Sequence, residues 1–320
     1  MESKNMNYMF NVEYFDGPNL LVDNQQFFEK RNTEICDFAF SEEYASDTVV
    51  KSIPDQMEFE LTTLYPGLLN GLGNPHNVKS KGAIKNGFCF DYVTGLPNIE
   101  GSYLKGVLRS PFPDYECLSG QKKWDELEKE KLSNITEVLE GCGEIGNTAS
   151  DSDKKARVKE LMELLFEKTE LSYMGAFPIL GNGPTKLLKT DFITKHEKMK
   201  NPNPIEILKV REGIVYRFYF RIPDNPRYRR NNIIKFFKQI ILIWGLGAKT
   251  NVGYGLFDEA LGPVTNVQDS SININVKKET EFGLCIKCKK NKTKKKPDSE
   301  EYYPYCPACH YKIKIEKNKA

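Results

Sequence analysis

Long apolar runs and histidines are scarce in this 320-residue sequence. No stretch reaches the roughly 18 consecutive apolar residues that a membrane helix requires, and the segment MESKNMNYMF lacks the basic flank and apolar run of a secretory signal. With three histidines in the chain, an enzyme that depends on a histidine pair has few options. We therefore expect a cytoplasmic protein that has no membrane partner.

The overall charge is also small, at +2, so it identifies no partner by itself. Apolar residues make up 39% of the chain and charged residues 28%, which is typical of a globular protein with a well-solvated surface. The length allows one large or two modest domains. Positive charge gathers at the C-terminal end, where the last 36 residues contain eleven lysines.

Four of the eight cysteines form two close pairs near the C-terminus. Cys285-x-x-Cys288 and Cys306-x-x-Cys309 are separated by seventeen residues, and four thiolates at this spacing can surround Zn²⁺ tetrahedrally. We expect a structural zinc ribbon over 281–320, with His310 exposed beside it. The segment KKNKTKKK between the pairs is either a solvated loop or a strip that contacts phosphates.

The remaining sequence predicts an α+β protein with an N-terminal extension over 1–52 and a core over 53–262. Alternating strands are expected in QMEFELTTLYPGLL, LSYMGAFPIL, KLLKTDFITKH and EILKVREGIVYRFYFRI. An apolar helix, NNIIKFFKQIILIWG, should begin with asparagine caps and end at Gly245. Two charged helices with narrow apolar stripes predict a surface insertion at about 118–170, and 263–280 is expected to be a linker.

The segment after this helix contains two Gly-x-Gly units, Gly245-Leu-Gly247 and Gly253-Tyr-Gly255, separated by five residues. Glycine lets backbone N–H groups come close to a phosphate and adopts positive φ without strain. Lys249 adds a cation, and Tyr254 a possible stacking face. We interpret the segment as a cradle for a nucleic-acid backbone.

Two other interpretations of this loop stay open. A nucleotide phosphate loop would require Gly-Lys-Ser/Thr at the start of a helix, whereas Ala248 precedes Lys249-Thr250 here and the helix comes before the loop. A purely structural turn between a helix and a strand could use the same glycines.

An earlier segment, GLPNIEGSYLKGVLRS, predicts a turn at 95–97 and a helix that begins near Gly101 with Ser102 as its N-cap. Lys105 and Arg109 lie one turn apart on the same side, so a phosphate could bind at the helix start. An ordinary capped surface helix is the alternative. Glu100 would place a carboxylate close to that phosphate.

Together, GLGNP, GLPNIEGSYLKGVLR, KTDFITKHEKMKNPNPIEILKV and GAKTNVGYG resemble, in this order, the RAMP superfamily of CRISPR proteins. They are most similar to the sixth subunit of the type III-B Cmr effector complex, over roughly residues 56–260. The resemblance implies a ferredoxin-like core related to RNA-recognition folds. It also implies binding of guide RNA along its backbone, with target RNA and other RAMP subunits as partners.

Carried over by motif, the RNA contacts would include Gly101, Ser102, Lys105, Gly106, Arg109, Gly245, Gly247, Lys249, Thr250, Asn251, Gly253, Tyr254 and Gly255. The resemblance implies a non-catalytic subunit of a type III effector complex that contacts the guide toward its 3′ end.

Two alternatives for the function remain. One is a guide-RNA-processing endoribonuclease of the same superfamily, for which Asp191 and His196 are the weak catalytic candidates. A carboxylate that orients the loop is the simpler role for Asp191, and an RNA contact the simpler role for His196. The other alternative is a zinc-dependent interaction adaptor that binds no RNA.

Overall fold

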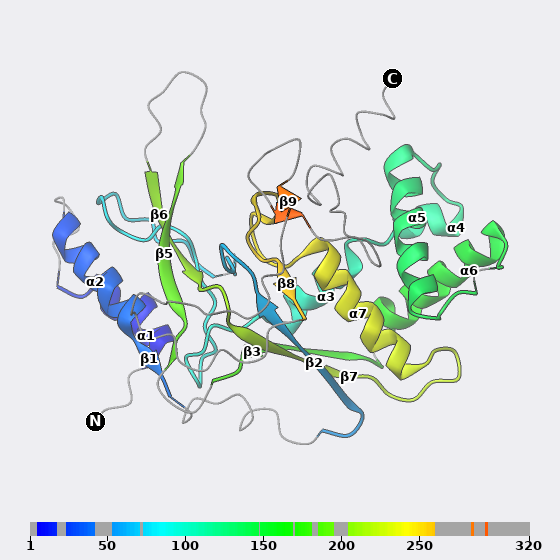
Figure 1. The fold of residues 1–320 in the computed structure, drawn as a ribbon, viewed down its shortest axis with the longest axis horizontal. Coiled ribbons are helices and arrows are strands. Elements are labelled where there is room, and N and C mark those ends of the chain that lie inside the picture. The colour runs from blue at the N-terminus through cyan, green and yellow to red at the C-terminus, as the bar shows by residue number, and fades with distance from the viewer. Residues whose placement is uncertain are drawn as a thin grey trace. The chain divides into compact units, whose positions relative to one another are not determined.

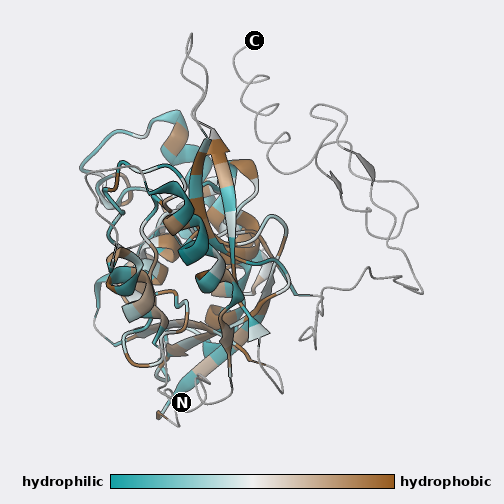
Figure 2. Ribbon diagram, turned by 90° about the vertical axis from the view of Figure 1, so that its left-hand side faces the viewer, coloured by the Kyte–Doolittle hydropathy of each residue, from teal (hydrophilic) through white to brown (hydrophobic). Residues whose placement is uncertain are grey.

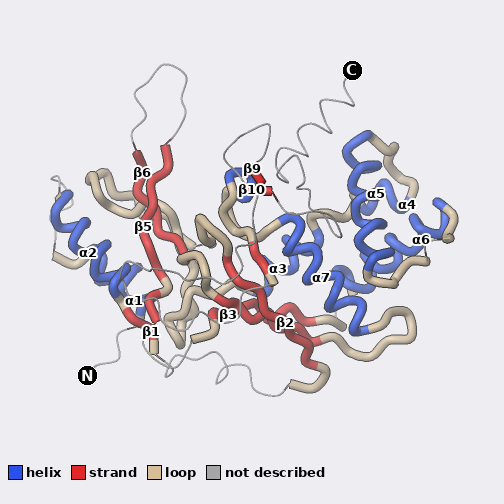
Figure 3. Tube along the Cα trace, in the orientation of Figure 1, coloured by secondary structure: helices blue, strands red, loops and turns tan. Residues whose placement is uncertain are grey.

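The computed structural model describes residues 5–17, 24–41, 53–70, 73–146, 148–168, 170–180, 185–194, 204–259, 283–284 and 292–293. The chain divides into two units, Met1–Asn266 and Val267–Ala320. The first unit contains all the described helices and two groups of strands (Figures 1 and 3). In the described part of the chain, no helix combines the length and the apolar character needed to cross a membrane.

A four-stranded antiparallel sheet lies at the centre of the first unit, in the order β3-β7-β2-β8. Helix α3 follows β2 in the chain and helix α7 follows β7, which gives the order β2-α3-β3-β7-α7-β8. The predicted strands and the apolar helix are therefore present. The bounds are β2 Gln56–Thr63, α3 Gly101–Arg109, β3 Ser172–Pro178, β7 Val215–Arg221, α7 Arg230–Trp244 and β8 Phe257–Asp258.

The central strand β7 buries one complete face. Tyr216, Phe218 and Phe220 are at most 1% exposed, and the Phe220 ring lies 5.1 Å from that of Phe237 on α7. The opposite face is only partly solvated, because Tyr219 is buried there while Arg217 pairs with Glu60 on β2. The expected alternation is therefore correct for the first face, whereas the second face is also buried in part.

The predicted start of α3 near Gly101 is confirmed, but the caps of both helices differ from the prediction. The N-cap of α3 is Glu100, which makes no side-chain capping bond, so Ser102 lies inside the first turn. The N-cap of α7 is Arg229, and the asparagines expected as caps are already helical. The predicted end of α7 is confirmed, since Gly245 follows Trp244 with φ 73°, a conformation that glycine adopts readily.

Helices α4 (Tyr115–Ser119), α5 (Glu126–Gly141) and α6 (Asp151–Met162), followed by the π-helical turn η4 (Glu163–Glu167), lie between α3 and β3 in the chain. Figure 1 shows them together beyond one end of α7. Their inner faces belong to the same apolar cluster as the sheet, through Ile135, Leu139, Val158 and Leu161 among others. The segment predicted as a surface insertion therefore also extends the core.

A second group of elements contains the N-terminal helices and a hairpin. Its members are α1 Met6–Asn11, the 3₁₀ turn η1 Glu13–Phe15, α2 Gln25–Asp37, β1 Ala39–Phe40, β4 Thr185–Lys186, β5 Leu188–Thr194 and β6 Pro204–Val210. Strands β5 and β6 pair antiparallel, as β1 and β4 do. The segment 206–222, predicted as one strand-like run, thus contributes to two strands, β6 and β7, which are separated by a turn.

These elements share the core of the sheet. Phe10, Tyr14 and Phe28 are buried in the same cluster as Phe218 and Leu108. Figure 2 shows hydrophobic residues on the strands and on inner helix faces, and hydrophilic residues on the outer helix surfaces. In the second unit, β9 (Gly283–Leu284) and β10 (Lys292–Thr293) form an antiparallel pair.

Candidate nucleic-acid interface

A single hydrogen bond joins the two sequence motifs that resemble RNA-binding segments. The hydroxyl oxygen of Tyr103, on α3, accepts a bond of 2.9 Å from the backbone N–H of Gly247. Burial raises the pKa of the Tyr103 hydroxyl, so it stays protonated. Two segments separated by more than a hundred residues in sequence are thus fixed side by side. Sequence reasoning missed Tyr103, although it lies within the motif, directly after Ser102.

The glycine loop, residues 245–255, is tied to the protein by its own backbone. Leu246 donates to the carbonyl of Gly255 at 2.8 Å, Ala248 to that of Leu69 at 2.8 Å, and Gly255 to that of Gly67 at 2.9 Å. The segment after β2 therefore holds the loop through two of these hydrogen bonds.

Backbone conformation and close contacts within the chain account for the four glycines of the loop. All four adopt positive φ, and a Cβ on Gly247 or Gly255 would overlap a backbone carbonyl oxygen, of Leu69 or Leu246 respectively. Each glycine N–H has an acceptor in the chain: Ile241 for Gly245, Tyr103 for Gly247, Thr250 for Gly253 and Gly67 for Gly255. The prediction that these amides cradle a phosphate is therefore wrong for this conformation, and the structural turn accounts for the glycines.

The loop nevertheless presents polar residues outward. Lys249 has φ 61°, the left-handed conformation that non-glycine residues adopt rarely, and it starts the 3₁₀ turn η5 (Thr250–Val252). Lys249, Asn251 and Val252 are exposed, and Thr250 is half-buried. Lys249 forms no ion pair with the described residues. The tightly held backbone thus displays a cation and two hydrogen-bonding side chains.

Helix α3 presents its own polar face beside the loop. Ser102, Gly106 and Arg109 are exposed and Lys105 is half-buried. The Arg109 guanidinium pairs with Glu167 at 2.9 Å, so its charge is partly neutralised within the chain. Ser102 is the second residue of the helix and not its N-cap, so its hydroxyl does not cap the helix end at which a phosphate was predicted to bind.

The two glycines of the α3 motif differ in how closely other atoms approach them. A Cβ on Gly101 would overlap the carbonyl oxygen of Tyr173 on β3, so the close packing of helix on strand requires glycine there. A Cβ on Gly106 would meet nothing within 4 Å. The packing of this chain leaves Gly106 unexplained, and its open surface is free for another molecule.

Asp191 connects the hairpin β5–β6 to the glycine loop. Its Oδ2 accepts bonds of 2.7 Å from Lys209 Nζ and 2.8 Å from the Tyr254 hydroxyl. Burial alone would raise the pKa of Asp191, but the bonds from Lys209, Tyr254 and the Phe192 amide hold it below its ordinary value. Asp191 is therefore an ionised carboxylate that orients the loop, which is the simpler role that the sequence allowed.

Tyr254 is buried in this arrangement. Its ring is 8% exposed and packs with Leu69 and Ile207, and burial raises the pKa of its hydroxyl, which donates to Asp191. The prediction of Tyr254 as a stacking face is wrong, because the ring faces inward. His196 lies outside the described residues.

The predicted zinc ligands, Cys285, Cys288, Cys306 and Cys309, also lie outside the described residues. The described strands β9 and β10 pair on either side of the first cysteine pair in the chain, with Leu284 opposite Lys292. Among the described residues, no group of three or more histidine, cysteine or acidic side chains could hold a metal ion.

The chain was compared with known proteins. It is similar to a chain in the cryo-EM structure of the type III-B Cmr-beta complex bound to cognate target RNA, at 19% identity and TM-score 0.41, over 79% of this chain and 84% of that one. It is similar to Cmr6 from Pyrococcus furiosus, at 19% identity and TM-score 0.41, over 66% of this chain and 100% of that one. A chain of a type IV-B CRISPR complex matches at 14% identity and TM-score 0.33, over 70% of this chain and all of that one.

No curated protein matches the sequence. The family comparison matches residues 60–258 to the RAMP superfamily, a range that spans both motifs, the central sheet and the glycine loop. This range is more than half of the chain. The chain therefore belongs to the RAMP superfamily.

Proposed function

We propose that this chain is a guide-RNA-binding subunit of a type III CRISPR effector complex and contacts the RNA backbone with α3 and the glycine loop. The observation that carries the proposal is the bond between Tyr103 and Gly247, which sets the two motif segments against each other. Both segments carry exposed or half-buried polar groups. These groups are Ser102, Lys105, Lys249, Thr250 and Asn251.

The chemistry of these side chains suits a ribose-phosphate strand. Lysine ammonium groups neutralise phosphates, while serine, threonine and asparagine side chains bond to phosphate and sugar oxygens without reading sequence. Such contacts fit a guide whose sequence differs from one RNA to the next. The rigid backbone beneath the loop holds Lys249 in place, so less conformational freedom is lost when RNA binds.

The order of elements supports a ferredoxin-like core as the scaffold. β2-α3-β3-β7-α7-β8 follows the βαββαβ pattern, with the strands in the order β3-β7-β2-β8 and all pairs antiparallel. In this proposal, α4 to α6 and the β5–β6 hairpin are insertions that leave the α3 and loop surface open. Neighbouring RAMP subunits would pack on the same scaffold, and the guide would be held toward its 3′ end.

The state of the acidic candidate supports a non-catalytic role. Both Asp191 oxygens accept hydrogen bonds within the chain, so the carboxylate is poorly placed to donate a proton to RNA. His76 is buried, and burial lowers its pKa to about 4, which leaves the imidazole neutral. These observations favour RNA binding over strand cleavage by this subunit.

We propose further that Cys285, Cys288, Cys306 and Cys309 bind one structural Zn²⁺. The β9–β10 pair supports this proposal, because a short hairpin around the first Cys-x-x-Cys is typical of zinc ribbons. The metal would supply the stability that so small a segment cannot obtain from a core. The lysine-rich segment over 289–296 would then be placed for contact with phosphates.

Filter binding of the full-length chain to guide RNA at low and high salt tests the main proposal. We expect binding that weakens steeply as salt rises, because neutralised phosphates release counterions. A denaturing gel of the same samples should show intact RNA. Absence of binding at low salt would favour a zinc-dependent adaptor, and RNA scission that Asp191→Asn abolishes would favour an endoribonuclease.

A further inference from the structure

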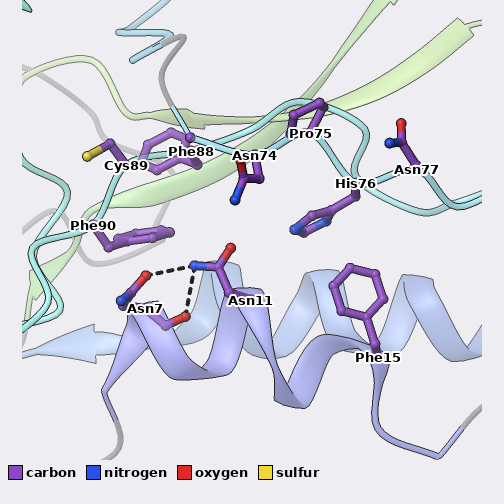
Figure 4. A pocket seen from close by; sticks show the side chains of 11 residues that line it. Asn7, Asn11, Phe15, Asn74, Pro75, His76, Asn77, Phe88, Cys89 and Phe90 are labelled. Atoms are coloured by element: carbon purple, nitrogen blue, oxygen red, sulfur yellow. Dashed lines mark hydrogen bonds between the residues drawn. The ribbon is translucent and has the colours of Figure 1, made fainter.

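Many aromatic rings of this chain are closed inside the core and offer no face to another molecule. Phe88 and Phe90, in the wall of the pocket that Figure 4 shows, are buried, and so is Tyr254 in the glycine loop. A surface that stacks nucleobases requires an open aromatic ring. Among the described residues, the exposed aromatic side chains are those of Tyr8, Tyr65, Tyr92 and Phe192.

The turn that carries Tyr65 is fixed to the glycine loop and to the residue that follows the loop. Before the turn, the Leu64 N–H donates to the Leu256 carbonyl at 2.9 Å. After it, the Gly67 carbonyl accepts a bond of 2.9 Å from the Gly255 N–H. Both bonds join backbone groups, so a change of the side chain at position 65 leaves them in place.

The Tyr65 side chain itself is open to solvent. It is 78% exposed, and it forms no hydrogen bond or ring contact with other described residues. Its hydroxyl adds to the rise in the pKa of the Tyr254 hydroxyl, so the two phenols lie near one another. Next to it in the chain, Pro66 lies close to the loop, since a Cβ on Gly253 would be 3.6 Å from its Cδ. Val252, the neighbour of that glycine, is also exposed.

The other exposed rings do not face the glycine loop. Phe192 follows Asp191 on β5, and successive side chains of a strand point to opposite faces. Phe192 therefore faces away from the side on which Asp191 bonds to the loop. Tyr8 is on α1, and Tyr92 lies at the start of that helix, where Asn5 Nδ2 donates to its carbonyl at 3.1 Å.

The surroundings of Tyr65 suit a nucleobase better than the apolar side chain of a protein partner. Lys249 and Asn251 are exposed on the loop against which the turn packs. Lysine is depleted at protein–protein interfaces. Open aromatic rings bordered by cations are instead typical of surfaces that bind single-stranded nucleic acid, where the cations hold phosphates and the rings stack on bases.

We propose that the Tyr65 ring stacks on one nucleobase of the guide RNA whose backbone is held by α3 and the glycine loop. The proposal rests on the proposed function and adds to it a contact with a base. Tyr65 takes the stacking role that the sequence suggested for Tyr254. Every base has a flat π face, so stacking reads no sequence and suits a guide whose sequence varies.

Filter binding of guide RNA by full-length variants tests this proposal. Tyr65→Ala should bind about tenfold more weakly, because one stacked base is lost. Its slope of log affinity against log salt should match that of the wild type, because no phosphate contact is lost. Tyr65→Phe keeps the ring and should bind like the wild type. Tyr92→Ala, the matched control at an equally exposed tyrosine, should also bind like the wild type.

Guide RNAs that lack a single base locate the contact. In the wild type, removal of the stacked base should weaken binding about tenfold. Tyr65→Ala should bind that abasic guide and the intact guide equally, because two changes that remove the same contact are not additive. Thermal melting identifies a variant that fails to fold, and Tyr65→Leu, which removes the ring but keeps an apolar side chain, decides if Tyr65→Ala does.

The outcomes separate this proposal from the proposed function. Wild-type affinity in Tyr65→Ala, an equal loss in Tyr65→Phe, a changed salt slope, or additive losses at every abasic position overturns the stacking contact. The proposed function stands in each of these cases, because the wild type still binds guide RNA. A wild-type chain that binds no guide RNA at low salt overturns both.

Discussion

The Tyr103 hydroxyl and the Gly247 amide, joined at 2.9 Å, connect helix α3 to the glycine loop. Tyr103→Phe removes the acceptor and leaves the amide without its partner. The Gly247 amide is half-buried, and a hydrogen bond of this kind contributes about 0.5–1.5 kcal/mol, so the free energy of unfolding should fall by about that amount. Urea denaturation measures this free energy.

Guide-RNA affinity should also fall in Tyr103→Phe, since the two segments lose their fixed spacing. If neither quantity changes, the bond does not organise the surface.

Gly255 and Gly106 should respond in opposite directions to alanine. In Gly255→Ala, the new Cβ would overlap the Leu246 carbonyl at a φ of 67°, so we expect a loss of about 3 kcal/mol or more. In Gly106→Ala, the Cβ meets open space within a helix, so stability should rise by up to about 1 kcal/mol. Thermal melting of both variants measures the difference, and equal destabilisation would contradict the packing described.

Gly106→Ala also tests the RNA contact at α3. If RNA lies against this open position, the added methyl group should weaken guide-RNA binding in filter assays although the protein is more stable. Unchanged affinity would place the RNA elsewhere on the helix.

The buried His76 should make stability depend on pH. Burial lowers its pKa from 6.5 to about 4; a backbone hydrogen bond at Ile84 opposes this shift, and the charge of Lys85 adds to it. The unfolded chain therefore binds more protons between these values, and stability contributed by the neutral imidazole is lost as pH falls from 6.5 through 4. The full effect is about 3 kcal/mol. His76→Phe should show a weaker decline across this range in chemical denaturation, and identical profiles would argue against a neutral buried imidazole.

Zinc content tests the C-terminal module. We expect about one zinc per chain by metal analysis of the purified protein. Cys288→Ser and Cys306→Ser should each reduce the zinc content, because each removes a thiolate ligand. Cys142→Ser, a change at a half-buried cysteine on the first unit, should retain the metal. Absence of zinc from the wild-type chain would contradict the proposed zinc ribbon.

The sequence predicted the elements whose buried apolar residues recur at a regular spacing. Alternation around Phe218 and the apolar face of 230–244 identified β7 and α7, and Gly245 identified the helix end. Helix caps were less predictable, because the chain enters α3 from a bridge between Ile99 and Ala176, with Glu100 at the cap position. That pairing lets the helix begin at Gly101 and leaves Ser102 inside the first turn.

The contacts that define the site depend on residues far apart in the chain. Asp191 meets Lys209 and Tyr254 through three different elements, and no local spacing encodes that meeting. The glycine pattern suggested open amides, but Ile241, Tyr103, Thr250 and Gly67 accept hydrogen bonds from all four of them. His76 belongs to no motif, and its burial depends on the packing of Phe10, Tyr14 and Phe15 around its ring.

The most direct test of the central claim is guide-RNA binding by Lys249→Ala, measured by filter binding over a range of salt concentrations. The exposed Lys129 on α5 provides the matched control, Lys129→Ala. We predict that Lys249→Ala melts like the wild type, binds guide RNA about five- to tenfold more weakly, and loses about 0.7 from the slope of log affinity against log salt, as expected for one fewer phosphate contact on a single strand. Wild-type affinity and slope in a folded Lys249→Ala variant would contradict RNA binding at the glycine loop.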